Sequence, residues 1–179
     1  ARWATRFTPI VAVDPPHGLP LAVSGCERLF RGRRRLVHRI AAEVGRLGFT
    51  ARVALAPSFA AAEAFARAGR WGRMLVDESR LAEALRPLPA WSLRLEDETL
   101  ETLTELGIER IGDLLALPRG ELGARFGAEL VLRLDQALGR AFEVIEPVRP
   151  QDPAVVRQDF AGPVTQFEAI QQAANQLLE

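Results

Sequence analysis

Two short apolar runs open the chain on either side of a cluster of turn residues. Residues 9–13 form the first run, and residues 19–24 form the second. Between them lie Asp14, Pro15, Pro16, His17 and Gly18. Prolines and a glycine between two apolar runs are typical of a tight reversal of the chain. We therefore expect the two runs to pair as a β-hairpin.

The next 40 residues show the helical period twice, with a short apolar run between. The first helix ends at Gly48, residues 52–56 read as a strand, and Ser58 is a suitable N-cap for a second helix. This order of two strands, helix, strand and helix predicts an α+β fold with a mixed sheet and helices on one side. The periodic positions are Leu36, Val37, Ile40, Ala41, Val44 and Leu47 in the first helix, and Phe59, Ala62, Phe65 and Ala66 in the second.

Beyond Pro87, Pro89 and Trp91 the pattern changes to short helices only. We expect them at about residues 97–106, 110–117, 119–126 and 128–138. Residues 142–153 carry three prolines and read as a linker. A strand at residues 155–160 and a helix at 167–178 would begin another domain. The chain thus divides into residues 1–86, 87–141, 142–153 and 154–179.

Composition narrows the possible partners and compartments. The 23 basic residues are all arginine and balance 23 acidic ones. The net charge is therefore zero, and no overall electrostatic attraction draws the chain to nucleic acid or membrane. One cysteine and two histidines exclude an internal disulfide and argue against a structural zinc site. No apolar run is long enough to span a bilayer. We expect a cytoplasmic protein, and the opening without methionine suggests a piece of a longer one.

Three segments, taken in order, resemble the Y-family DNA polymerases. Residues 21–30 (Leu-Ala-Val-Ser-Gly-Cys-Glu-Arg-Leu-Phe) resemble the palm strand that follows the second catalytic motif. Residues 54–63 (Ala-Leu-Ala-Pro-Ser-Phe-Ala-Ala-Ala-Glu) are similar to the second palm motif, and residues 103–117 to the helix-hairpin-helix segment of the thumb. The Ser-Gly-Cys-x-x-Leu-Phe stretch is nearest to the catalytically inactive ImuB-like group.

The resemblance implies a fold and a division into domains. Residues 1–86 would be the C-terminal part of a palm, a partial mixed sheet with helices. Residues 87–141 would be an all-α thumb with a helix-hairpin-helix. Residues 142–153 would be a linker, and residues 154–179 the start of a little-finger domain.

The resemblance also implies that the active-site residues are replaced. His17 and Gly18 stand where active members carry an Asp-Glu pair, and Ala22 stands at a further aspartate. Phe59 and Glu63 occupy two lysine positions. Nucleotidyl transfer needs clustered carboxylates that hold two divalent ions. We therefore expect a pseudo-polymerase with no catalytic residue, metal or cofactor.

Contacts with DNA are expected to be weak and non-specific. The Gly-hydrophobic-Gly turn that holds a phosphate in helix-hairpin-helix motifs is Arg94-Leu95-Glu96 here. An acidic face formed by Asp97, Glu98, Glu101 and Glu105 follows it and is a candidate docking surface. The candidate DNA-contacting residues are the basic cluster Arg31, Arg33, Arg34 and Arg35, and, in the thumb, Gly107, Ile108 and Arg110.

The function that the resemblance implies is that of an adaptor in damage-induced, mutagenic translesion synthesis. Its expected partners are a RecA-like ImuA-type protein, the sliding clamp and an error-prone replicative-type polymerase subunit. Two alternatives remain open at this point. One is an active Y-family polymerase with a displaced metal site, and the other is a helix-hairpin-helix module that binds DNA.

Overall fold

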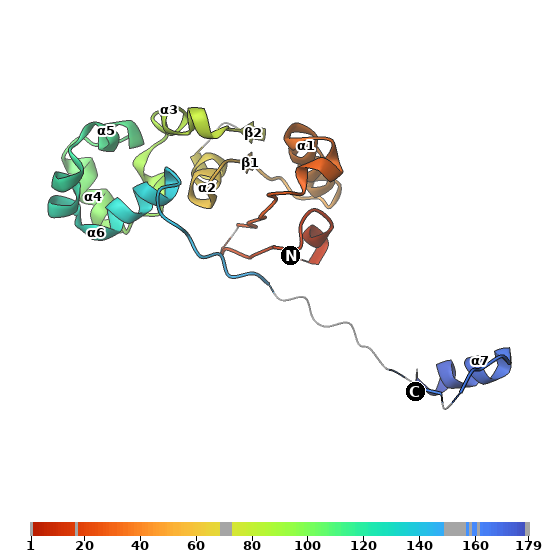
Figure 1. The fold of residues 1–179 in the computed structure, drawn as a ribbon. Coiled ribbons are helices and arrows are strands. Elements are labelled where there is room, and N and C mark those ends of the chain that lie inside the picture. Colours follow the sequence, from red (N-terminus) through yellow and green to blue (C-terminus); the bar gives the residue numbers. More distant parts are fainter. Residues whose placement is uncertain are drawn as a thin grey trace. The chain divides into compact units, whose positions relative to one another are not determined.

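The computed structural model describes residues 2–16, 18–68, 73–148, 157, 159–160 and 162–177 (Figure 1). Two compact units are present, residues 1–148 and residues 149–179. Within the described ranges, no helix is long and apolar enough to cross a membrane. The fold is α+β, as predicted, and helices dominate it.

The predicted hairpin is present but forms no regular ladder. After the 3-10 helix η1 (Arg2–Arg6), isolated antiparallel bridges join Val11 to Leu21 and Asp14 to Gly18. The Ala12 amide donates to the Pro20 carbonyl at 3.0 Å, and the Ala22 amide to the Ile10 carbonyl at 3.1 Å. Proline lacks an amide hydrogen, so the four prolines of residues 9–20 leave gaps in the pairing.

The helix predicted after the hairpin is α1 (Arg33–Arg46), which follows the 3-10 helix η2 (Glu27–Phe30). Its buried residues are Leu36, Val37 and Ile40, all among the predicted apolar positions. Leu36 and Ile40 share a hydrophobic cluster with Phe7 and Val23 from the N-terminal segment. This small core fixes α1 against the hairpin.

The one sheet that the described residues form is a parallel pair, β1 (Val53–Leu55) and β2 (Arg73–Leu75). The sequence predicted β1 but not β2. Val53 and Leu55 pack on the cluster under α1, whereas Ala54 packs on the cluster of α2 (Phe59–Ala68). Successive side chains of a strand point to opposite faces. Both faces are therefore covered (Figure 1), and the prediction of helices on one side was wrong.

Helix α2 begins as predicted, but its buried face is rotated. The Ala61 amide donates to the Ser58 hydroxyl at 3.2 Å, so Ser58 is the N-cap. Ala61, Ala64 and Phe65 are buried, so the prediction is confirmed for Phe65, whereas the predicted Phe59, Ala62 and Ala66 are only half-buried. The reason is that α2 packs against β1 on one side and against later helices on another.

The four predicted short helices are all present. They are α4 (Asp97–Glu105), α5 (Ile111–Ala116) and α6 (Arg119–Ala137), the last of which joins two predicted helices across a break at Gly127. Gly127 has a φ of 84°, which favours glycine. The 3-10 helices η3 (Glu78–Arg80) and η4 (Ala90–Leu93) and the short α3 (Leu81–Leu85) were not predicted.

The largest hydrophobic core extends across the predicted palm–thumb boundary. It combines buried residues of α2, α3, η4, α4, α5 and α6, including Phe65, Leu85, Leu103 and Leu130. The Ser58 hydroxyl also donates to the carbonyl of Ala137 at the end of α6, at 3.1 Å. The two predicted parts thus share one core, and the boundary at residues 86–87 stays a prediction.

Part of the predicted linker lies on the first unit. The Val148 amide donates to the Val11 carbonyl at 2.8 Å, so residues 142–148 return to the hairpin. In the second unit, α7 (Phe167–Gln176) confirms the predicted last helix. Half of the predicted strand at residues 155–160 lies outside the described residues, and the described residues 157, 159 and 160 are in no strand.

Candidate functional site

The turn between η4 and α4 keeps a glycine-like backbone although it contains no glycine. Arg94 has φ 58° and ψ 45°, a left-handed conformation that favours glycine. Leu95 is buried, and Glu96 is extended as the residue before α4. The turn joins η4 to α4, with an arginine where the resemblance predicts the first glycine of the hairpin.

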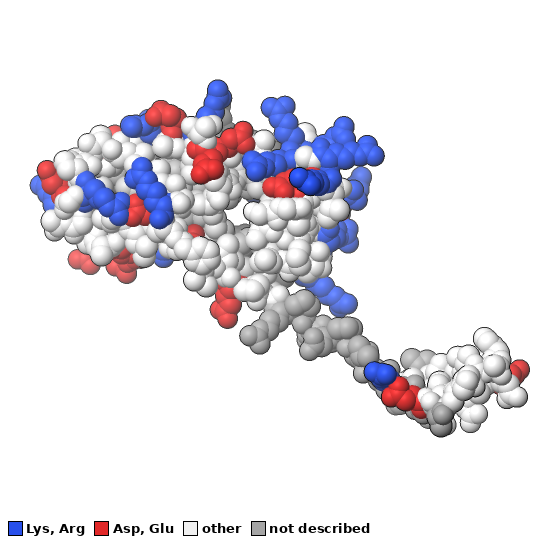
Figure 2. Space-filling model, viewed as in Figure 1, with Lys and Arg blue, Asp and Glu red and all other residues white. Residues whose placement is uncertain are grey.

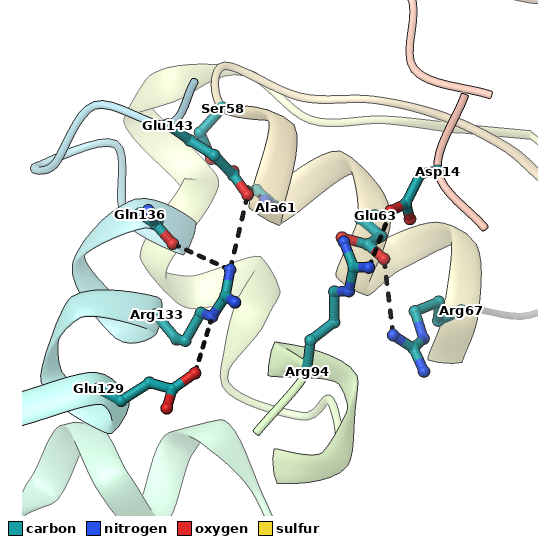
Figure 3. A network of polar contacts seen from close by, with 10 residues as sticks. All are labelled: Asp14, Ser58, Ala61, Glu63, Arg67, Arg94, Glu129, Arg133, Gln136 and Glu143. Atoms are coloured by element: carbon teal, nitrogen blue, oxygen red, sulfur yellow. Dashed lines mark hydrogen bonds and ion pairs between the residues drawn. The ribbon is translucent and has the colours of Figure 1, made fainter. Parts of the chain in front are cut away.

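The Arg94 side chain leaves this turn and joins two distant carboxylates (Figure 3). Its Nη2 lies 2.8 Å from Oδ1 of Asp14, and its Nη1 lies 3.3 Å from Oε2 of Glu63. Arg67, one turn further along α2, lies 3.5 Å from Oε1 of Glu63. We call Asp14, Glu63, Arg67 and Arg94 the Arg94 cluster. It connects the hairpin, α2 and the turn before α4.

Partial burial sets the electrostatics of the Arg94 cluster. The Glu63 side chain is 13% exposed, and burial raises the pKa of its carboxyl, with the nearby charges of Asp14 and Glu143 acting in the same direction. The positive charge of Arg94 opposes this rise. Desolvation lowers the pKa of Arg94, but its bonds to Asp14 and Glu63 outweigh this and raise it. Arg94 is thus the main counter-ion for both carboxylates.

A second polar group lies beside the cluster and ties down the segment that follows α6 (Figure 3). Arg133 of α6 lies 3.8 Å from Glu143 and bonds Gln136 at 3.5 Å. Burial raises the pKa of Glu143, although a hydrogen bond to the Ala60 backbone acts in the opposite direction. Arg133 Nε and Glu143 Oε2 are buried without a hydrogen-bond partner. The segment after α6 is thereby held at the start of α2.

Of the positions predicted to have lost metal-binding carboxylates, Gly18 has little room for a side chain. A Cβ on Gly18 would lie 2.8 Å from the Asp14 Cβ and 2.9 Å from the Asp14 carbonyl oxygen. Ala22 is half-buried in the hairpin, and its carbonyl accepts a hydrogen bond from the Thr8 hydroxyl. His17 lies outside the described residues. Among the residues that are described, no group of three or more His, Cys, Asp or Glu is placed to hold a metal ion.

The two predicted lysine replacements lie on successive turns of α2. Phe59 and Glu63 are four residues apart and both half-buried. Only Glu63 joins the Arg94 cluster. Its partners Asp14, Arg67 and Arg94 were not predicted from the sequence. The available signal was an acid at a predicted lysine position together with an arginine at a predicted glycine position.

The predicted basic cluster divides into engaged and solvent-facing arginines. Arg31 ends η2 with φ 57°. Arg33 lies 3.5 Å from Glu27 and 3.2 Å from Asp77. Arg34 and Arg35 are exposed and make no ion pair with any residue that the structure describes. Figure 2 shows the arginines gathered over α1.

The three candidate DNA-contacting residues of the predicted thumb have structural roles. Gly107 ends α4 with φ 72°, and Ile108 packs on the main core. The Arg110 amide donates to Oδ2 of Asp113 at 2.9 Å, which caps α5. On α4, all four acids of the predicted acidic face, Asp97, Glu98, Glu101 and Glu105, are exposed.

Comparison with known proteins identifies relatives in sequence and in fold. Protein ImuB of Caulobacter vibrioides, from strain NA1000 and from strain ATCC 19089, is 38% identical over 172 residues. These matches cover 96% of this chain and 37% of each relative. DinB from Sulfolobus solfataricus has a TM-score of 0.60 at 19% identity, over 82% of this chain and 44% of its own. A Dbh ternary complex has a TM-score of 0.58 at 19% identity, over 82% of this chain and 45% of its own. No family model matches.

The fold is therefore that of the Y-family DNA polymerases, from palm into thumb. Within that class, the chain belongs to the Y-family polymerase-like proteins of the ImuB-like group. It spans 37% of the length of the ImuB relatives that it matches.

Proposed function

We propose that the protein is a non-catalytic, polymerase-like adaptor in damage-induced mutagenic translesion synthesis. The observation that carries the proposal is the ion pairing of Arg94 with both Asp14 and Glu63. Arg94 stands at a hairpin glycine position and Glu63 at a lysine position of the polymerases that the chain resembles. A cation fixed in this place competes with any divalent ion for the two carboxylates.

The chemistry of nucleotidyl transfer supports this proposal. The reaction needs carboxylates free to hold two metal ions and positive side chains near the triphosphate. Here Gly18 has no space for a side chain, and Ala22 offers no oxygen ligand beyond its backbone. Phe59 and Glu63 supply no positive charge. A protein that retains the core yet lacks these groups is best suited to presenting surfaces to partners.

The partners of the adaptor are proposed from its relationship to the ImuB-like group. They are a RecA-like ImuA-type protein, the sliding clamp and an error-prone replicative-type polymerase subunit, all in the cytoplasm. DNA contact is proposed to be weak, because the described hairpin is acidic and its phosphate-binding glycines are replaced. The adaptor would bring the error-prone polymerase to the clamp at a lesion.

Primer extension by the full-length protein tests the absence of catalysis. We expect no template-dependent incorporation with either magnesium or manganese, whereas an active Y-family polymerase extends the same primer. Incorporation that disappears in Asp14→Asn or Glu63→Gln would overturn the proposal. That result would favour the alternative of a displaced metal site, because it would show that Arg94 does not keep metal from these carboxylates.

A further inference from the structure

The outward face of α1 is an arginine-rich surface with no acidic side chain on it. Arg34, Arg35, Arg39 and Arg46 are exposed and fall within an arc of about 140° at 3.6 residues per turn. Leu36, Val37 and Ile40 lie on the opposite, buried side. Glu43 lies at the edge of the arc and is already bonded to Arg6 at 2.7 Å and to Arg39 at 3.1 Å.

The stability of α1 does not account for all of these arginines. Arg39 has a local role, since it bonds Glu43 and its guanidinium lies 6.0 Å from the Phe30 ring centroid. Arg34 and Arg35 have no such partner among the described residues. They lie in the first turn, where a positive charge opposes the helix dipole. Their placement costs helix stability, which points to a role outside the fold.

The charge is concentrated in this part of the chain. Residues 27–52 contain eight arginines and two glutamates, so 8 − 2 = +6, whereas the whole chain is neutral. Figure 2 shows this basic region over α1. A surface of this charge attracts an acidic partner and raises the rate of encounter.

Large apolar side chains are exposed at both ends of α1. Leu29, just before the helix, is 81% exposed, and Leu47 and Phe49, just after it, are 51% and 68% exposed. Interfaces between proteins combine arginine with aromatic and large aliphatic side chains, and their apolar anchors supply much of the binding energy. Non-specific binding to a DNA duplex is supplied essentially by charge and needs no such anchors. The composition therefore favours a protein partner over DNA.

We propose that this surface docks an acidic protein segment that carries apolar side chains for Leu29 and Phe49. The α1 surface is defined as Leu29, Arg34, Arg35, Arg39, Arg46 and Phe49. It is separate from the Arg94 cluster in sequence and in chemistry. The proposal rests on the adaptor function proposed above, and it assigns one partner contact to a definite face.

Binding measurements on the full-length protein test the α1 surface. The analytes are the RecA-like protein, the sliding clamp and the error-prone polymerase subunit of the same organism, and a 20-base-pair duplex, each by itself. We expect Arg34→Glu/Arg35→Glu to weaken the binding of one of these proteins at least tenfold, mainly by slower association. Leu29→Ala/Phe49→Ala should weaken the binding of the same protein through faster dissociation. The matched control, Arg125→Glu/Arg140→Glu in the predicted thumb, should bind each partner with an affinity within twofold of that of wild type.

Each outcome decides between definite alternatives. Thermal melting of every variant identifies loss of folding, and Arg34→Ala/Arg35→Ala is the milder replacement if the double reversal unfolds. Wild type that binds a partner while the charge variants bind it equally well overturns the α1 surface and leaves the adaptor function intact. Wild type that binds none of the three proteins overturns both. Loss of duplex binding alone assigns the surface to DNA and also overturns the proposal.

Discussion

The Arg94 guanidinium lies 2.8 Å from the Asp14 carboxylate although 80 residues separate the two in sequence. Asp14 belongs to the hairpin before α1, and Arg94 to the turn before α4. Glu63 of α2 completes the contact at 3.3 Å. One arginine therefore connects three segments, and it does so from a left-handed backbone position where glycine is favoured.

Replacing Arg94 should separate the value of its ion pairs from the cost of its backbone conformation. We expect Arg94→Ala to lower the free energy of unfolding by about 1–3 kcal/mol, because two largely buried carboxylates lose their counter-ion. Arg94→Gly should be about 1 kcal/mol more stable than Arg94→Ala, because glycine relieves the left-handed strain. Urea unfolding measures both. Equal stability of the two variants, with Arg125→Ala as the surface control, would contradict the role of strain.

The stability of the protein should depend on pH through Glu63. Burial raises the pKa of Glu63 above its ordinary 4.5, so the folded state binds a proton more readily than the unfolded state. Stability contributed by this group is therefore present below pH 4.5 and is lost as pH rises through the folded pKa. Wild type should lose stability relative to Glu63→Gln as the pH rises from 4.5 through the folded pKa of Glu63. Both proteins keep Glu143, whose pKa is also raised.

Asp135 supplies a control of opposite sign. The Arg119 guanidinium is hydrogen-bonded to Asp135 and lowers the pKa of this carboxyl. Its stability contribution is present above pH 3.8, the ordinary value, and is lost as pH falls through the folded pKa. The stability of wild type should therefore increase relative to that of Asp135→Asn as the pH rises out of the acid range. Parallel pH profiles for Glu63→Gln and Asp135→Asn would show that burial does not control Glu63.

The sequence predicted most local elements, and it failed where distant segments meet. The apolar period placed both ends of α4 and α5 to within one residue and the end of α1 to within two, since that signal is local. Strand β2 was missed because it is only three residues long and its stability comes from pairing with β1. The rotated face of α2 has the same origin, because contacts with α6 select which alanines are buried.

The candidate site shows the same limit. The motifs predict that Gly18, Ala22, Phe59 and Glu63 are altered positions, but they do not indicate which residues Glu63 contacts. Asp14 and Arg94 come together only through the fold, and neither belongs to a periodic pattern. The sequence predicts that Arg94 weakens phosphate binding by the hairpin turn, whereas the structure gives Arg94 two carboxylate partners.

Gly18 should reject even the smallest side chain. Gly18→Ala places a Cβ 2.8 Å from the Asp14 Cβ and 2.9 Å from its carbonyl oxygen, so we expect a loss of about 1–3 kcal/mol in unfolding free energy. Gly45→Ala is the matched control, because nothing lies within 4 Å of that position in α1. Alanine in a helix is favoured over glycine, so this control should gain about 0.5–1 kcal/mol. A harmless Gly18→Ala would contradict the lack of space for a side chain at this turn.

Ser58 should stabilise the junction between α2 and α6. Its hydroxyl accepts a hydrogen bond from the Ala61 amide at 3.2 Å and donates one to the Ala137 carbonyl at 3.1 Å. Ser58→Ala removes both, and we expect a loss of about 1–2 kcal/mol in thermal or urea unfolding. Ser24→Ala, an exposed serine of the second apolar run, should change the stability by less than about 0.5 kcal/mol. Similar effects of the two changes would mean that the Ser58 hydroxyl contributes nothing at this junction.

The hairpin before α4 should repel DNA, and its acids should be the cause. Residues 93–117 carry seven acids and two arginines, so 2 − 7 = −5, and Glu96, Asp97 and Glu98 are exposed at the start of α4. Wild-type affinity for duplex DNA should be micromolar at best near physiological salt. Neutralising the three acids (Glu96→Gln, Asp97→Asn, Glu98→Gln) should strengthen binding about 3- to 10-fold at low salt, and the gain should shrink as salt screens the charges.

Fluorescence anisotropy over a range of salt concentrations distinguishes this expectation from a helix-hairpin-helix that binds DNA. The control variant neutralises three exposed acids elsewhere, Glu78, Glu83 and Glu121, and should bind as wild type does. The alternative requires tight wild-type binding that falls when Gly107 or Arg110 is changed to alanine. It also requires the neutralised hairpin to bind no better than wild type, because phosphate contacts would already be made. Weak wild-type binding that strengthens only in the hairpin variant would instead assign the repulsion to these three carboxylates.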